Sequence, residues 1–199
     1  MVLPACGTGD KEVFDQRPAQ TAVGTDTLDS LVDSVPVTTL LSETGPVVPV
    51  GVQMVVGFTY SASADDVGGP IRNPYIAVWI EDSRGNLVQT ISAWYQQTSK
   101  GLRYLNYLRS WYTQYADSGL EPTTSGATRG PGTYTVAWDA TGLDGKPVAQ
   151  GDYVLFVEAA REQGPYSFTS TPITLGTSGF GVTLGADGEL SALTAEITV

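Results

Sequence analysis

The chain has 199 residues, among them 23 Gly, 12 Pro, a single Cys and no His. Without His, a Ser-His-Asp triad, a Cys-His pair and a His-ligated zinc site are excluded, and one Cys excludes an internal disulfide. Twenty-one acids against ten bases give a net charge of -11, which disfavours binding to nucleic acid and to anionic lipid.

The first 51 residues have the composition of a linker, rich in Thr, Asp, Ser, Gly and Pro. At their start, Leu3-Pro4-Ala5-Cys6 resembles a bacterial lipobox, in which the Cys becomes the lipidated first residue of the mature protein. We therefore expect Cys6 to be the site of lipidation and the lipid anchor to be the only membrane contact; the alternative is a free thiol. Within the arm, residues 28–35 favour a short helix at most, and residues 37–41 a strand.

From residue 52 onward the pattern is typical of strands, because Met54, Val56, Phe58 and Tyr60 alternate with small or polar residues. Further strands are predicted at 75–82, 87–95, 133–138, 152–161, 171–175, 180–184 and 190–199. Residues 101–115 differ, since their apolar side chains recur every three or four positions, as on an amphipathic helix. We predict that residues 52–199 form an antiparallel β-sandwich of immunoglobulin-like type, with one helical insertion at about 101–115.

Several motifs resemble a known family. They are Pro74-Tyr75-Ile76-Ala77-Val78-Trp79-Ile80-Glu81-Asp82, Val136-Ala137-Trp138-Asp139, Asp144-Gly145-Lys146-Pro147-Val148 and Gly151-Asp152-Tyr153. Over roughly residues 50–199 the chain is similar to predicted periplasmic proteins that carry domain of unknown function 2271. The resemblance implies an extracytoplasmic location and an association with flavin-transfer and membrane redox proteins. The segment from Trp138 to Tyr153 alone also resembles the immunoglobulin-like domain of flagellar hook-capping proteins.

Charged residues suggest a polar site where the helix crosses the edge of the sheet. In strand alternation Glu158 and Glu162 share one face, while Arg161 points to the other, and an acid in so apolar a strand needs a partner. The alternative, which we favour, is a structural salt-bridge network between helix, loop and sandwich. The candidate residues are Arg103, Arg109, Arg129, Glu158, Arg161 and Glu162.

Aromatic residues form a second candidate site, because they are concentrated between residues 94 and 115. If exposed, Trp94, Tyr107 and Trp111 would offer a stacking platform for a sugar, a flavin or a partner protein. The alternative is that Trp111 belongs to the buried face of the helix. Tyr107 lies nearest the arginine-bearing face, so we expect it to be the exposed member.

The sequence favours a non-enzymatic cell-envelope binding or accessory module, whose partner is an envelope protein or a small ligand. No metal site and no cofactor are predicted. One alternative is a carboxylate-dependent hydrolase, for which Glu81, Asp82, Glu158 and Glu162 are the available acids. The other is a structural subunit that assembles at the cell surface through exposed edge strands.

Overall fold

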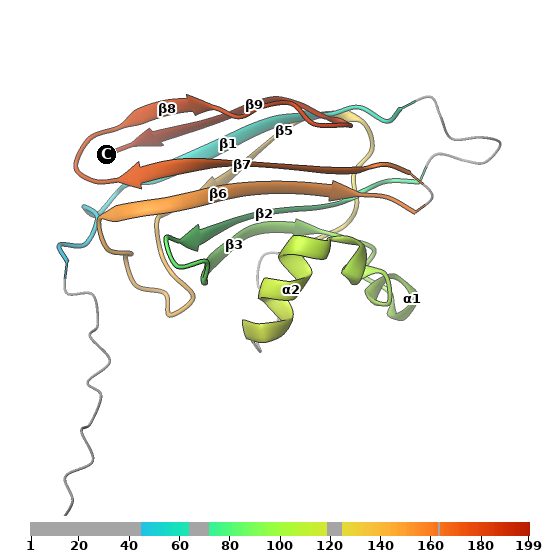
Figure 1. Cartoon of the computed structure of the whole chain (residues 1–199), viewed down its shortest axis with the longest axis horizontal. Helices are drawn as coiled ribbons and strands as arrows, with labels where there is room; N and C mark the ends of the chain where they lie inside the picture. Colours follow the sequence, from blue (N-terminus) through green and yellow to red (C-terminus); the bar gives the residue numbers. More distant parts are fainter. Residues whose placement is uncertain (1–44, 64–71, 119–124, 163) are drawn as a thin grey trace, which may run out of the picture. The chain divides into compact units, whose positions relative to one another are not determined.

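Two β-sheets and a helical layer make up the part of the chain that the computed structural model describes, residues 45–63, 72–118, 125–162 and 164–199. The four-stranded sheet has the order β5-β1-β9-β8, and the five-stranded sheet the order β4-β3-β2-β6-β7. Figure 1 labels every one of these strands except β4. The predicted mainly-β sandwich is confirmed, and its immunoglobulin-like assignment stays a prediction. The strands are β1 Gln53–Tyr60, β2 Tyr75–Asp82, β3 Leu87–Trp94, β4 Ser125–Gly126, β5 Gly132–Trp138, β6 Gly151–Ala160, β7 Tyr166–Leu175, β8 Phe180–Thr183 and β9 Leu190–Thr198.

Neighbouring strands are antiparallel, apart from the two-residue β4, which runs parallel to β3. In the five-stranded sheet, Ala77 of β2 lies opposite both Ala93 of β3 and Glu158 of β6. Strand β7 begins at Tyr166, five residues before the start that the sequence predicts, and Tyr166 pairs with Ala160. The early part of β7 escapes the sequence pattern because its serines and threonines carry no aliphatic signal.

The main core lies between the two sheets and follows the alternation predicted for β1. Met54, Val56, Phe58 and Tyr60 are at most 1 % exposed, whereas the residues between them face outward. Trp138 at the end of β5 packs into the same core and donates its indole N–H to the carbonyl of Thr141 at 2.8 Å. Each large apolar side chain buried in this way contributes about 1.5–3 kcal/mol to folding.

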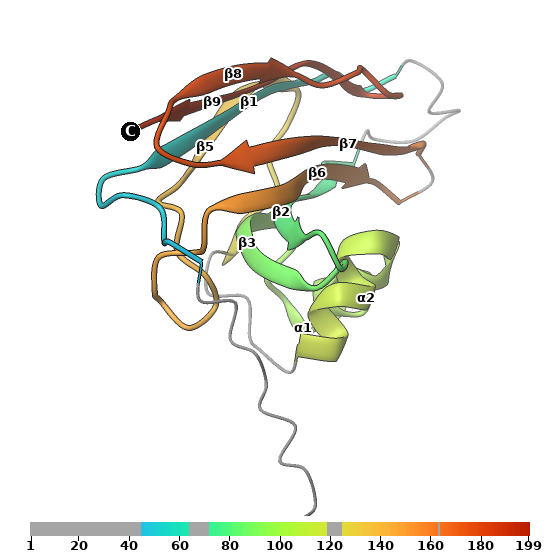
Figure 2. The same ribbon diagram turned by 60° about the vertical axis from the view of Figure 1, so that its left-hand side comes forward.

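The helical segment covers the outer face of the five-stranded sheet (Figure 2). A second core lies beneath it. Tyr75, Ala77 and Trp79 of β2 belong to it, together with Leu108 and Trp111 of the helical segment. Strand β2 is therefore buried on both faces, because Ile76, Val78 and Ile80 face the core between the sheets. This explains its nearly continuous apolar sequence.

The predicted helix at 101–115 is wrong in one respect, because the segment is broken into three pieces. These are α1 Ser99–Leu102, the 3-10 turn η1 Leu105–Tyr107 and α2 Arg109–Ser118. The Thr98 hydroxyl caps α1 by accepting the Gly101 N–H at 3.1 Å. At Leu108 the backbone leaves helical geometry, with ψ of 76°. The breaks allow Leu105, Leu108 and Trp111 all to reach the sheet, while Leu102 is left 51 % exposed.

The described part of the expected arm, residues 45–51, already contacts the sandwich. The Val48 N–H donates to the Val148 carbonyl at 3.0 Å, the Gln150 N–H donates to the Pro46 carbonyl at 2.8 Å, and Val48 is buried. Cys6 and the elements expected at 28–35 and 37–41 lie outside the described residues. No helix in the described ranges is long and apolar enough to cross a membrane.

Candidate functional site

Glu158 of β6 is a fully buried carboxylate beneath the helical layer. Its two oxygens accept the backbone N–H groups of Ser110 at 3.2 Å and Trp111 at 2.9 Å, so it caps the start of α2. No ion pair within 4 Å joins it to Arg103, Arg109 or Arg129. The prediction of an arginine partner for Glu158 is therefore wrong. Two backbone amides at the start of the helix, which have no acceptor within it, bind the carboxylate instead.

Burial changes the acid–base properties of this region. Desolvation raises the pKa of Glu158 above its ordinary value, although the hydrogen bond from the Trp111 amide acts in the opposite direction. The neighbouring phenol of Tyr166 lies 3.2 Å from the Ser110 hydroxyl, and burial raises its pKa to about 12. Tyr166 therefore remains protonated and neutral at physiological pH.

Arg161, which follows β6, points to the opposite side of the sheet, as strand alternation predicts. Its guanidinium forms a buried ion pair with Glu189, with Nη2 2.8 Å from Oε1 and Nε 3.0 Å from Oε2. Tyr60 of β1 donates to the same carboxylate at 3.1 Å. The pair thus joins the two sheets at one end of the sandwich. Glu189 could not be predicted as the partner of Arg161, because no sequence pattern connects the two residues across 28 positions.

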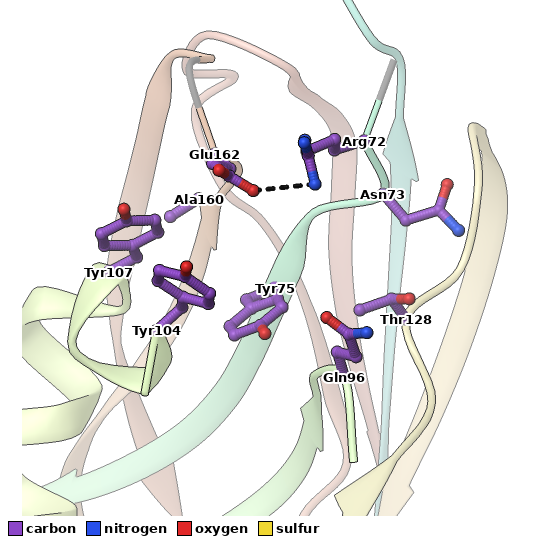
Figure 3. A pocket seen from close by; sticks show the side chains of 9 residues that line it. All are labelled: Arg72, Asn73, Tyr75, Gln96, Tyr104, Tyr107, Thr128, Ala160 and Glu162. Carbon is purple, nitrogen blue, oxygen red and sulfur yellow. Dashed lines mark ion pairs between the residues drawn. The ribbon is translucent and has the colours of Figure 1, made fainter. Parts of the chain in front are cut away.

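A pocket of about 250 Å³ lies at this end of the five-stranded sheet, beside the helical layer (Figure 3). We call it the tyrosine pocket, since Tyr75 at the start of β2, Tyr104 and Tyr107 contribute their rings. The Tyr104 and Tyr107 ring centroids are 5.4 Å apart, and Tyr107 is 37 % exposed. The remaining lining residues are Arg72, Asn73, Gln96, Thr128, Ala160 and Glu162.

The charges of the tyrosine pocket compensate one another. Arg72 and Glu162 form an ion pair with Nη1 3.0 Å from Oε2, and Figure 3 shows it across the pocket from the rings of Tyr75 and Tyr104. Besides the tyrosine hydroxyls, the other polar groups among the described lining residues are the two amides and one hydroxyl of Asn73, Gln96 and Thr128. The described lining residues therefore offer aromatic faces and directional hydrogen-bonding groups without an excess of charge.

A close backbone contact joins two segments next to the tyrosine pocket. Gly101 of α1 approaches Gln96 so closely that a Cβ would lie 2.6 Å from the Gln96 Cβ and 2.7 Å from its carbonyl carbon. The Tyr75 hydroxyl donates to the Gly101 carbonyl at 2.9 Å. Only glycine fits at position 101, and it positions two lining residues at once.

A second pocket of about 190 Å³ adjoins the first and shares Tyr107 and Ala160 with it. We call it the arginine pocket, because Arg109 and Arg161 both contribute to its lining, together with Gly164, Pro165 and Tyr166. The Arg109 guanidinium lies over the Tyr166 ring, 4.5 Å from its centroid. This cation–π contact fixes the orientation of an exposed arginine.

The structure distributes the sequence-derived candidates over several places. Arg109, Arg161, Glu162 and Tyr107 line the two pockets, whereas Glu158 caps α2. Arg129 instead covers Trp94, 4.1 Å from the ring centroid, and Arg103 is exposed and lines neither pocket.

The proposed platform of Trp94, Tyr107 and Trp111 is also divided. Trp94 and Trp111 are 3 % and 0 % exposed, so both belong to cores, and only Tyr107 faces a pocket. The residues that join Tyr107 there are Tyr75 and Tyr104. Tyr104 belongs to the aromatic cluster between residues 94 and 115, but the continuous helix predicted there did not single it out. Tyr75 reads as strand core in the sequence.

The comparison with protein families bears directly on this region. Residues 65–192 match the model of a family described as predicted periplasmic protein (DUF2271), and this range includes every residue that lines either pocket. The chain belongs to this family. The resemblance given by the sequence motifs is thus confirmed, and the family description places the protein outside the cytoplasm. No curated protein and no solved structure matches the chain significantly.

Proposed function

We propose that this protein is a non-enzymatic extracytoplasmic binding module, and that the tyrosine pocket binds an uncharged sugar ring. The observation that carries the proposal is the combination of three tyrosine rings with planar polar side chains around a pocket of about 250 Å³. This volume lies below the roughly 300–1,000 Å³ typical of sites for larger ligands, and so suits a single ring.

The chemistry of a pyranose ring matches this lining. One face of such a ring presents C–H groups, which pack on aromatic side chains such as Tyr104 and Tyr107, while its rim presents hydroxyl groups. These hydroxyls are both donors and acceptors, and the amides of Asn73 and Gln96 supply both complements. Binding would therefore bury apolar surface and satisfy the polar rim.

A flavin is the competing ligand, because the family resemblance implies an association with flavin-transfer proteins. A flavin mononucleotide brings a phosphate that needs an uncompensated cation. Arg72 is the basic residue of the tyrosine pocket, and Glu162 already neutralises it. Within the tyrosine pocket itself, the charge balance therefore favours an uncharged ring. A parallel titration tests the nucleotide directly.

The proposal is tested by calorimetric titration of the full chain with uncharged monosaccharides and disaccharides. The sugars have gluco, galacto, manno and N-acetylhexosamine configuration. Flavin mononucleotide is titrated in parallel. We expect at least one sugar to bind, and the substitutions Tyr104→Ala and Tyr107→Ala to remove that binding. Binding of the flavin in place of every sugar would overturn the assignment.

Tyr112→Ala is the matched control, because Tyr112 lies on α2 outside both pockets and has the same 37 % exposure as Tyr107. It should leave the affinity unchanged. If Tyr112→Ala weakened binding as much as Tyr107→Ala, the tyrosine pocket would not be the site.

The contacts of two candidate acids support a non-enzymatic function over a carboxylate-dependent hydrolase. Glu158 is 0 % exposed, and both of its carboxylate oxygens accept backbone N–H groups of α2. Glu81 accepts the Trp79 indole N–H at 2.7 Å. Incubating a bound oligosaccharide with the protein tests this point, since release of reducing ends that Glu162→Gln abolishes would identify an enzyme.

We also propose that Cys6 carries the lipid that keeps the protein at the membrane. The lipobox-like Leu3–Cys6 and the linker composition that follows support this proposal. In cells that express the protein from its own locus, Cys6→Ser should shift it from the membrane fraction to the soluble extracytoplasmic fraction. An unchanged distribution would contradict the anchor.

A further inference from the structure

The tyrosine and arginine pockets lie side by side, with Tyr107 and Ala160 in the wall of both. A ligand that fills the first pocket and extends past Tyr107 therefore enters the second. The two pockets differ in charge, and this difference indicates what the extension carries.

Arg109 supplies the charge of the arginine pocket. Its guanidinium is held over the Tyr166 ring at 4.5 Å, and within the described part of the chain no carboxylate lies within ion-pair distance of it. An oriented guanidinium offers two parallel N–H donors, an arrangement that matches a carboxylate. Because the tyrosine contact fixes the side chain in advance, less conformational entropy is lost on binding.

The other charges around this pocket are already compensated. Arg161 is paired with Glu189 in a buried bidentate contact. The Glu158 carboxylate lies beneath α2 and accepts the first amides of that helix, so the positive end of the helix dipole offsets its charge. Among the described residues that line this pocket, Arg109 is therefore the cation that remains to attract an anionic group.

We propose that the two pockets together bind an acidic oligosaccharide, with a neutral ring in the tyrosine pocket and a carboxylate-bearing ring against Arg109. This inference rests on the proposed function of the tyrosine pocket and extends it to a ligand class. The ligand is at least two sugar residues long and contains a uronic acid or a similar acidic sugar.

Matched disaccharides test the charge preference on the full chain. Three pairs are used: glucuronosyl-glucose, galacturonosyl-galactose and mannuronosyl-mannose, each beside its carboxyl-reduced form, which differs only in having a CH2OH group in place of the carboxylate. In at least one pair the acidic member should bind about tenfold more tightly, the gain expected of one charged hydrogen-bonded contact. Raising the salt concentration should reduce this ratio, since the ion pair is partly exposed.

Arg109→Gln removes the charge and keeps a planar amide. It should abolish the advantage of the acidic disaccharide, so that the acid and its reduced form bind the variant with affinities within about twofold of each other. Arg103→Gln is the control, an exposed arginine of the same segment that lines neither pocket. It should preserve the preference.

The outcomes separate the two proposals. One outcome is that neutral sugars bind, that Tyr107→Ala abolishes their binding, and that in no pair the acidic disaccharide binds more tightly. The proposal of an acidic oligosaccharide is then wrong, and the sugar-binding function stands. The same holds if Arg109→Gln leaves the preference intact. If neither neutral nor acidic sugars bind, both proposals fall.

Discussion

The carboxylate of Glu158 on β6 accepts the backbone N–H of Trp111 on α2 at 2.9 Å, so a strand residue caps a helix that precedes it by 47 positions. Capping groups usually come from the residue just before the helix. Here the cap also fastens the helical layer to the sheet and thereby sets the position of Arg109, the first residue of α2. The site and the fold thus depend on the same buried carboxylate.

Removing this cap should destabilise the protein. Glu158→Ala leaves the amides of Ser110 and Trp111 buried without their acceptor, and should lower the free energy of unfolding by about 1–3 kcal/mol. Glu158→Gln retains one carbonyl oxygen and should cost less. Urea denaturation at neutral pH measures both, and equal losses in the two variants would contradict the capping role.

The same carboxylate makes stability depend on pH. Burial raises the pKa of Glu158 in the folded protein, so between the ordinary pKa of a Glu and that raised value the folded state binds a proton that the unfolded state does not. The free energy of unfolding should therefore fall as pH rises through this window. In Glu158→Gln that contribution is absent, so the wild type should lose stability relative to the variant as pH rises in urea titrations. A constant difference would show that Glu158 does not titrate there.

The buried ion pair between the sheets should behave in the opposite way. Although burial acts to raise it, the pKa of Glu189 is lowered by the Arg161 guanidinium. The stabilisation is thus present above the ordinary pKa of a Glu and is lost as pH falls through the lowered value. Glu189→Ala leaves the buried Arg161 guanidinium without its carboxylate and should lower the free energy of unfolding by about 3–5 kcal/mol at neutral pH.

Arg72→Ala serves as the comparison for Glu189→Ala, because the Arg72–Glu162 pair is partly exposed. Breaking such a surface pair should cost less than about 1 kcal/mol. Similar losses in the two variants, measured by the same urea titrations, would mean that the Arg161–Glu189 pair adds nothing through its burial.

The contact between Gly101 and Gln96 connects stability with binding. Gly101→Ala forces a Cβ against the Gln96 backbone, which should cost about 1–3 kcal/mol and displace a lining residue of the tyrosine pocket. Gly181→Ala is the control, since a Cβ there meets nothing within 4 Å. Thermal unfolding and sugar titration should show a loss of stability and of sugar affinity only in Gly101→Ala. Wild-type stability of that variant would contradict the close contact between Gly101 and Gln96.

Trp138 anchors the core between the sheets at the end of β5. Its ring is 3 % exposed, so Trp138→Ala should lower the free energy of unfolding by about 3–5 kcal/mol. Tyr112→Ala, on the exposed face of α2, should change it by no more than about 0.5 kcal/mol. Equilibrium denaturation measures the free energy of unfolding of both variants. A small loss in Trp138→Ala would show that this ring does not pack in the core.

The strands could be predicted because burial on one or both faces leaves a local signature. Alternation in β1 and the unbroken apolar sequence of β2 each determine an element within a few residues. The division of residues 99–118 into three pieces could not be predicted. It depends on Leu105, Leu108 and Trp111 all having to reach β2 and β3. Local periodicity carries no information about that fit.

The candidate site was only partly predictable for a similar reason. Exposure of Tyr107 follows from its place beside the arginines, but its neighbours in the pocket come from positions as distant as Arg72, Thr128 and Glu162. The partners of Glu158 were missed because backbone amides, which every residue carries, leave no trace in a sequence. Side-chain charge suggested an arginine where the fold supplies a helix terminus.

The burial of β2 on both faces couples the two cores. Any event that opens the space between the sheets also removes the support on which the helical layer rests, and loosening that layer exposes Trp79 to water. Deuterium should consequently enter the amides of β1 and β6 at rates set by one shared opening reaction. A ligand held in either pocket would then protect residues on the far side of the sandwich that it never touches.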